Sequence, residues 1–259
     1  MKTQLKVELI EFTPNPEKLV AAAAKLCYAS FGVENIMDDL DENKTTNFIS
    51  MLNSIGHESP IEHVSYTFAI SGVSRALLAQ ITRHRLASYS VRSQRYVNEK
   101  QFEYIIPPEI ENMPEAKELY IKAMEEDQKT YLKLSELLKN KHKEELIASG
   151  VDPIEADKKA EKKGNEDARF ILPNACETKM VVTMNARSLN NFFNLRCCSR
   201  AQWEIRDLAT EMLKLVRKVS PTLFAKSGPP CYAYGKCPEG KMSCGSIKHV
   251  KEKFTNLIL

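Results

Sequence analysis

The stretch "RHRLASYSVRSQRY", residues 83–96, follows the apolar segment "VSRALLAQIT", residues 73–82. It holds four arginines and one histidine in fourteen positions. Cationic side chains beside an apolar segment are costly to bury unless an anion neutralises them. Three interpretations follow: a solvated basic turn, a contact for nucleic acid, or a pocket for a small phosphorylated ligand.

The bulk composition is that of an ordinary globular protein. The chain has 259 residues, of which 43% are hydrophobic and 27% charged. A net charge of +3 is too small to indicate, by itself, a protein that coats nucleic acid. The sequence has neither a long apolar run nor a signal peptide, and its seven cysteines form no disulfide framework. We therefore expect a cytoplasmic protein without a membrane partner.

The periodicity of apolar residues predicts interleaved strands and helices in a single domain over residues 1–259. Strands are expected at residues 5–12, 63–70 and 178–184. Helices are expected at residues 15–31, 43–56 and 74–82, and continuously over 185–219. A polar helical excursion is expected near 114–167, its mixed charges forming solvated faces, and an irregular tail from about 229.

Two segments superficially resemble metal sites, and for both we favour a structural interpretation. In "HESPIEH", residues 57–63, the histidines are six apart with Pro60 between them, whereas a zinc helix needs them four apart. A hydrogen-bonded turn is favoured there. Near the C-terminus, Cys231, Cys237, Cys244 and His249 lack closely spaced cysteine pairs, so free thiols are favoured over zinc. No metal is expected.

The segment "NARSLNNFFNLR", residues 185–196, places polar side chains at the border of an apolar helix. Arg187, Asn191 and Leu195 recur at intervals of four and share one face, and Phe192 and Arg196 lie on the neighbouring face. Buried polar groups need partners, and a planar polar ligand would supply them. Arginines that extend to water are the alternative, and the pattern alone leaves both open.

Seven arginines come from three separated segments, each at a junction between predicted elements: Arg83, Arg85, Arg92, Arg95, Arg169, Arg187 and Arg196. Arginine donates in bidentate fashion to phosphates and carbonyl-like oxygens. If these segments converge, they could hold a nucleotide phosphate together with a second anionic cofactor.

These residues also resemble a known family. Arg83-His84-Arg85, seven residues and then Ser93 are similar to the RHR-x7-S signature of the flavin-dependent thymidylate synthases. Further blocks resemble the same family in the same order: "GHESPIEHVSYTF", Gln80-x-x-Arg83, "NARSLNNFFNLR" and "AQWEIRDLA".

The resemblance implies a reaction, a set of ligands and a fold. Such an enzyme methylates dUMP to dTMP with carbon from 5,10-methylenetetrahydrofolate, and NADPH reduces its bound FAD. The implied partners are dUMP, folate and NADPH, with no nucleic acid, in a homotetramer whose active sites are shared between subunits. The implied fold is α+β, a mixed, largely antiparallel sheet flanked by helices, as in thymidylate synthase-complementing proteins.

The resemblance also assigns positions to the two bound ligands. The implied FAD-binding positions are His57, Ser59, Arg83, His84, Arg85, Asn185, Arg187 and Asn191. The implied dUMP-binding positions are Gln80, Arg83, Ser93, Gln94, Arg95, Arg169 and Arg196. Arg196 is the implied catalytic residue, which favours ionisation of the uracil at N3. Because arginine is a poor base, its role should be that of a fixed cation.

One departure from the family pattern keeps alternatives open. Ser90-Val91 stands where many members have Asn-Glu, so no carboxylate contact to the nucleotide or the flavin is expected from this position, and only backbone groups of Val91 can substitute for it. A relative that binds ligands without catalysis, and a nucleic-acid-binding protein, are the alternative hypotheses. The folate-only synthases use a cysteine nucleophile before a histidine, whereas Cys231 here precedes Tyr232, which favours the flavin-dependent interpretation. Ser93 is expected to orient the substrate, because the flavin performs the difficult chemistry.

Overall fold

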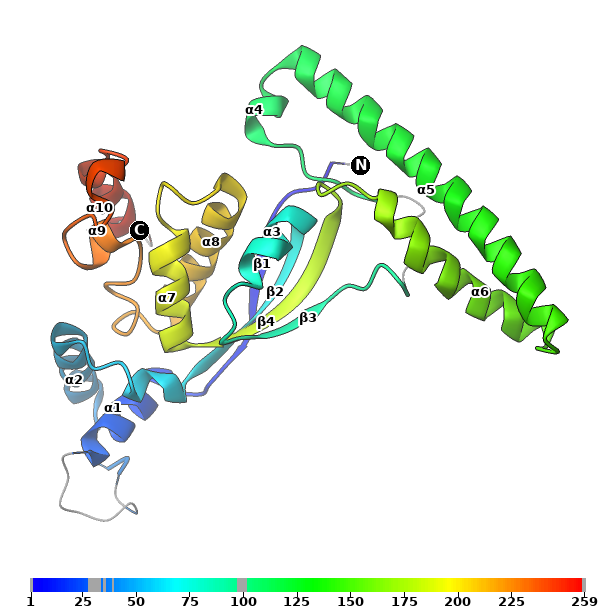
Figure 1. Cartoon of the computed structure of the whole chain (residues 1–259). Coiled ribbons are helices and arrows are strands. Elements are labelled where there is room, and N and C mark those ends of the chain that lie inside the picture. Colours follow the sequence, from blue (N-terminus) through cyan, green and yellow to red (C-terminus); the bar gives the residue numbers. More distant parts are fainter. Residues whose placement is uncertain (1, 28–33, 35, 39, 97–101, 258–259) are drawn as a thin grey trace. The chain divides into compact units, whose positions relative to one another are not determined.

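The computed structural model describes residues 2–27, 34, 36–38, 40–96 and 102–257 (Figure 1). The chain forms two compact units, each assembled from three separated segments. The hairpin unit comprises Met1–Leu5, Ser71–Ala79 and Val91–Met180, and the pocket unit comprises Lys6–Ile70, Gln80–Ser90 and Val181–Leu259. The single functional domain expected from the sequence stays a prediction, since one domain can contain two compact units.

A four-stranded antiparallel sheet, with helices around it, confirms the α+β class. Its strands, in the order β1-β2-β4-β3, are β1 (Lys6–Phe12), β2 (Ser65–Ser74), β4 (Glu177–Asn185) and β3 (Ser88–Val91). The hydroxyls of Thr67 on β2 and Thr183 on β4 lie 2.9 Å apart, so these two residues are neighbours across the strand pair. Strand β3 was not predicted, because it is only four residues long and lies within the arginine-rich stretch.

In the pocket unit, helices α1 (Pro16–Leu26) and α2 (Glu42–Ile55) precede the short helix η2 (Pro60–His63). Helix α2 begins after Asp41, whose Oδ1 accepts from the amide of Lys44, and ends at Gly56 in the left-handed conformation, as predicted. The helix predicted for residues 15–31 ends at Leu26. Residues 28–31 of that prediction lie outside the described residues.

The prediction of one continuous helix over residues 185–219 is wrong. Helix α7 (Ala186–Arg196) ends, and α8 (Trp203–Val219) begins seven residues later. The side chain of Gln202 accepts from the amides of Glu204 and Ile205 and so caps the start of α8. This local cap competes with continuation of the helix, and an apolar pattern does not show it.

The prediction of an irregular tail is also wrong in part. The tail contains α9 (Pro230–Ala233), the 3-10 turn η4 (Gly240–Met242) and α10 (Ile247–Thr255). Val250 and Phe254, four residues apart on α10, are both buried. The buried Arg217 of α8 donates a hydrogen bond of 2.7 Å to the carbonyl of Phe254. It also donates hydrogen bonds to the carbonyls of Phe224 and Ser227, which precede α9. This network attaches the tail to the core of the unit.

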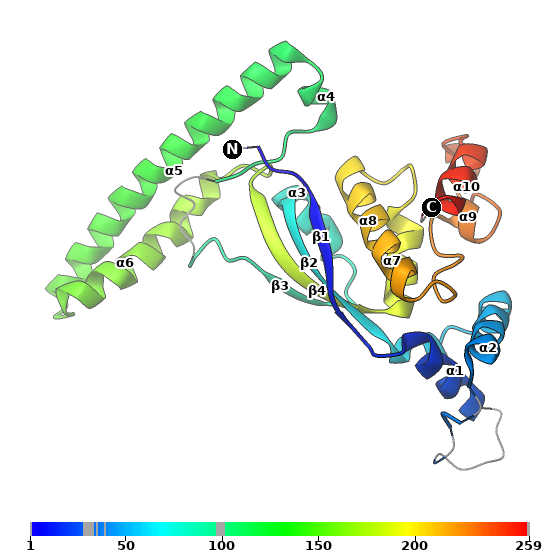
Figure 2. The ribbon, with the colours of Figure 1, turned by 180° about the vertical axis from the view of Figure 1, so that it is seen from behind.

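In the hairpin unit, α5 (Pro114–Ala148) and α6 (Pro153–Ala168) form the predicted polar excursion as a helical hairpin (Figures 1 and 2). Lys139 on α5 lies 2.7 Å from a carboxylate oxygen of Asp157 on α6. A Cβ on Gly164 would stand 3.0 Å from the backbone nitrogen of Lys139, so the two helices pack closely. The unit also contains α4 (Pro108–Glu111) and η3 (Arg169–Ile171). Helix α3 (Arg75–Ile81) begins in this unit and ends in the pocket unit.

No helix within the described ranges is both long and apolar enough to cross a lipid bilayer.

Candidate active site

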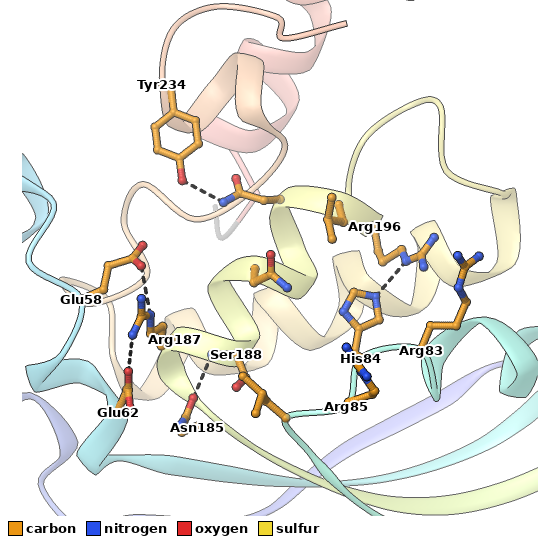
Figure 3. A pocket seen from close by; sticks show the side chains of 14 residues that line it. Glu58, Glu62, Arg83, His84, Arg85, Asn185, Arg187, Ser188, Arg196 and Tyr234 are labelled. Carbon is orange, nitrogen blue, oxygen red and sulfur yellow. Dashed lines mark hydrogen bonds and ion pairs between the residues drawn. The ribbon is translucent and has the colours of Figure 1, made fainter.

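A cavity of about 1020 Å³ lies within the pocket unit (Figure 3). Helix α7 contributes Arg187, Ser188, Asn191, Asn194, Leu195 and Arg196 to its lining. The remaining lining comes from the loop after α3, from the segment around η2, from Asn185 and from Tyr234 in the tail. Four sequence segments that are distant in the chain therefore meet at one concave surface.

Helix α7 has two faces, and the sequence predicted this division. Its buried face packs Ala186, Leu189, Phe192 and Phe193 into the core. The predicted polar face, marked by Arg187, Asn191 and Leu195, lines the cavity. The helix begins where the Oδ1 of Asn185 accepts from the amide of Ser188 at 2.8 Å. The arginines of α7 therefore face an open cavity rather than the core.

One end of the cavity is cationic. Arg83 and Arg85 come from the loop after α3, and Arg196 comes from the last turn of α7. Within the described residues none of these three guanidinium groups is ion-paired with a carboxylate. Burial, followed by the charge of Arg83, lowers the pKa of Arg196 below its usual range. An anionic ligand would relieve this repulsion.

His84 lies among these arginines as a neutral acceptor. Its Nε2 stands 3.0 Å from the Nε of Arg196, and that nitrogen always carries a proton, so the arginine donates. Burial first, and then the charges of Arg196 and Arg83, lower the pKa of His84 to about 4. The ring also meets Phe192 edge-on, with centroids 5.0 Å apart. His84 therefore adds no positive charge near neutral pH.

The opposite end of the cavity is acidic on balance. Arg187 Nε lies 3.1 Å from an oxygen of Glu58, and its Nη1 bonds Glu62 (Figure 3). These contacts, first with Glu62 and then with Glu58, raise the pKa of Arg187 above its usual value. Two carboxylates against one guanidinium leave a net negative charge. Glu58 and Glu62 were not predicted as site residues from the sequence, although both lie in the "HESPIEH" segment.

The structure brings most of the predicted FAD positions together. Six line the large cavity: Arg83, His84, Arg85, Asn185, Arg187 and Asn191. His57 and Ser59 are not in its lining, although both line a smaller cavity of about 290 Å³. Glu58 lines both of these cavities and a third of about 240 Å³, so it marks the point where the three adjoin.

The predicted dUMP positions divide between the two units. Arg83 and Arg196 line the cavity, and Gln80, at the end of α3, belongs to the same unit without lining it. The remaining positions belong to the hairpin unit: Ser93, Gln94, Arg95 and Arg169.

Within the hairpin unit, three of these positions have identified contacts. Arg95 Nη2 lies 2.9 Å from Glu166, and its buried Nε has no hydrogen-bond partner among the described residues. The buried Gln94 amide lies 3.6 Å from the sulfur of Cys176. Arg169 stands over the ring of Phe170, 5.9 Å from its centroid. The predicted positions therefore do not form a single cluster within one unit.

Tyr234 and Asn194 line the cavity and were not predicted from the sequence. The amide of Asn194 donates 2.9 Å to the hydroxyl of Tyr234. The Oδ1 of Asn194 is inaccessible and has no hydrogen-bond partner among the described residues. Asn194 follows Asn191 by three positions, so the helical period could have identified it. Nothing in the sequence around Tyr234 marks it as a site residue.

The cysteine-rich tail provides no metal cluster in the described part of the chain, where no three His, Cys, Asp or Glu side chains are placed to share an ion. The buried Cys231 thiol has its pKa raised, first by burial and then by neighbouring thiols. A thiol with a raised pKa is a poor nucleophile near neutral pH.

The cavity fits an anionic cofactor of the size of FAD. Its volume is at the upper end of the range for ligand sites. Its cationic end offers guanidinium groups to phosphates, and its amides offer hydrogen bonds to a heterocycle.

Fold and cavity together define an α+β protein with a large arginine-lined site for anionic ligands. The sequence profile of the family described as "Thymidylate synthase complementing protein" matches residues 8–222. A protein of Clostridium tetani (strain Massachusetts / E88), named flavin-dependent thymidylate synthase, is 57% identical over 248 residues, 96% of each chain. Proteins with the same name are 44% identical in Geobacter sulfurreducens (98% of this chain and 99% of the relative) and 38% identical in Thermococcus onnurineus (100% of both). The chain belongs to the thymidylate synthase complementing protein family.

Proposed function

We propose that the chain is a flavin-dependent thymidylate synthase, which methylates dUMP to dTMP with methylenetetrahydrofolate as carbon donor and NADPH as reductant. One observation carries the proposal. The Arg83-His84-Arg85 triplet of the signature and the polar face of α7 line the same cavity, although more than a hundred residues separate them in the chain. The names of relatives that match 96% and 98% of the chain support the same activity.

The cavity residues would hold FAD by charge and by hydrogen bonds. Arg83 and Arg85 would contact its phosphates, while Asn185 and Asn191 would bond its polar edges. Bound there, FAD would supply the redox chemistry that connects NADPH with the one-carbon unit transferred from folate. The protein itself binds and orients the cofactor and the substrate, and it excludes water from the site.

Arg196 would stabilise negative charge on the pyrimidine. A guanidinium cannot act as a base near neutral pH, so it cannot remove the N3 proton itself. It is partly buried, and a fixed cation in a partly desolvated site stabilises a developing anion more than the same cation in water. Favouring the N3-ionised uracil makes its ring more electron-rich at the carbon that receives the methyl group.

We also propose the homotetramer with shared active sites, in the cytoplasm. The family resemblance supports this arrangement, and the predicted dUMP positions Ser93, Gln94, Arg95 and Arg169 belong to the hairpin unit rather than to the pocket unit. A neighbouring subunit could present these residues to the cavity. Arg95 would then exchange part of its contact with Glu166 for the nucleotide phosphate.

Flavin content and tritium release test the proposal. The purified protein should be yellow, and NADPH should bleach its flavin absorbance without oxygen. Tritium should be released from deoxyuridylate labelled at the carbon that is methylated, and only in the presence of methylenetetrahydrofolate. A colourless protein that FAD cannot reconstitute would contradict the proposal.

The same assays separate the alternative hypotheses. Bound flavin without tritium release would indicate a non-catalytic relative, and would direct attention to Ser90 and Val91 at the end of β3. High affinity for nucleic acid that falls steeply with salt, without flavin, would indicate the nucleic-acid hypothesis.

A further inference from the structure

The orientation of Arg196 has a specific physical problem. Arg83 carries the same charge and lies close enough to lower the pKa of Arg196. Repulsion between like charges favours side-chain conformations that move the two guanidinium groups apart. An arginine side chain has many rotamers, so a fixed orientation needs a partner that is not a second cation.

His84 supplies that partner. The Nε–H of Arg196 donates a hydrogen bond of 3.0 Å to the Nε2 of His84. Among the described residues, this guanidinium makes no other hydrogen bond. The two terminal amino groups of Arg196 thus keep their donors for a ligand in the cavity that it lines.

His84 is itself held in place from three directions. Its backbone amide donates a hydrogen bond of 3.0 Å to the carbonyl of Ile81, and its carbonyl accepts one of 2.9 Å from the hydroxyl of Tyr89. Its ring packs edge-on against Phe192, which lies on α7 one turn before Arg196. The acceptor is therefore fixed relative to the helix that carries the arginine.

We propose that His84 is a positioning residue that takes the Nε–H of Arg196 on its neutral imidazole and so aims the two terminal amino groups of Arg196 at the pyrimidine. This inference rests on the proposed function. It gives the imidazole a role toward Arg196, in addition to the cofactor position that the resemblance assigns to it. A protonated imidazole could not accept this bond, and the two neighbouring arginines disfavour protonation.

Three substitutions of His84 separate this role from a purely structural one. His84→Gln places an amide oxygen near the position of Nε2 and can still accept from Arg196. In His84→Asn the acceptor is closer to the backbone, near the position of Nδ1, and does not reach. His84→Leu has no acceptor. All three remove the aromatic contact with Phe192, so they are matched in that respect.

We expect kcat to differ between the Gln variant and the other two variants. His84→Gln should keep kcat for dUMP within about threefold, while His84→Asn and His84→Leu should lower it about 10- to 100-fold, the usual effect of losing one charged hydrogen bond. Each variant lacks the imidazole at the cofactor position, so any loss of FAD content should be equal in all three, and kcat is compared at saturating FAD. The KM for dUMP should change less than about threefold. In crystal structures, the Arg196 guanidinium should keep its orientation in the Gln variant and leave it in the Asn variant.

Three outcomes would overturn the inference. Equal kcat in all three variants would show that the acceptor is not used. A loss of turnover that follows FAD occupancy alone and disappears at saturating FAD in all three would show that the imidazole serves only the cofactor. An unchanged Arg196 orientation in the Asn variant would show that another group fixes it. Failure of the proposed function is distinct from these, because it appears as absent tritium release in the unmodified protein.

Discussion

Arg187 and Arg196 lie nine residues apart on one helix and line one cavity, yet their surroundings are opposite. Arg187 is about half exposed and bonds two carboxylates, Glu58 and Glu62. Arg196 is more buried, bonds a neutral histidine and lies near a second cation. The comparison indicates that one arginine is already neutralised by the protein, while the other awaits an anion from outside.

The direction of helix α7 explains part of this difference. The first turn of a helix carries partial positive charge, and the last turn carries partial negative charge. Arg187 stands in the first turn of α7, where the dipole is unfavourable for a cation, and carboxylates compensate. Arg196 stands in the last turn, where the dipole is favourable, so it can remain without a carboxylate partner.

The largest expected effect is the loss of turnover on substitution of Arg196. Arg196→Ala should lower turnover by about 100- to 1000-fold, the range for removing one preorganised donor to a developing anion. FAD content should stay near that of the unmodified protein. Tritium release and flavin absorbance measure the two quantities. If flavin content falls in step with turnover, Arg196 serves the cofactor rather than the pyrimidine.

Arg187 should show the reverse pattern. Arg187→Ala should weaken FAD binding about 10- to 100-fold, because it removes a cation and leaves two carboxylates without a counter-charge. The turnover of the FAD-saturated enzyme should change much less. FAD titration of the apoprotein measures the affinity.

A matched triple variant identifies the cause of that loss. Arg187→Ala combined with Glu58→Gln and Glu62→Gln removes the uncompensated carboxylates as well. If affinity returns, repulsion caused the loss. If it does not, Arg187 contacts FAD directly.

A smaller effect is expected for Glu62→Gln alone. The net charge at that end of the cavity becomes zero, so the anionic cofactor should bind about two- to fivefold tighter at low salt. The gain should shrink as salt is added, because these groups are about half exposed. FAD titrations at low and high ionic strength measure it. Weaker binding at both would show that Glu62 orients Arg187 for a direct contact.

The smallest expected effect concerns pH. His84 has a pKa of about 4 in the folded protein against 6.5 for the ordinary side chain. Between these values the unfolded chain binds a proton that the folded chain does not, so stability falls as pH drops from 6.5 toward 4. Urea unfolding at about pH 7 and about pH 5 measures the loss. His84→Gln should lose less than the unmodified protein over this interval, and an equal loss would contradict the neutral His84.

Local patterns in the sequence predicted some elements well. The alternation of residues in β1, the Gly56 stop of α2 and the polar face of α7 follow from periodicity and local conformational preference. The break between α7 and α8 was missed, because it depends on a side-chain cap by Gln202. The order in the tail was missed, because it depends on Arg217, whose carbonyl partners extend to Phe254, 37 residues further along the chain.

The sequence by itself determined the class of site. Three features can be recognised from the sequence alone, because each is local: the arginine-rich signature, the polar helix face and the family blocks in a fixed order. Only the tertiary structure decided which partner each cation has. Glu58 lies 129 residues from Arg187, and His84 lies 112 residues from Arg196. Charges interact through space rather than along the chain. The sequence therefore shows where the arginines are, and the fold determines whether a protein carboxylate neutralises each positive charge or whether it remains available to a ligand.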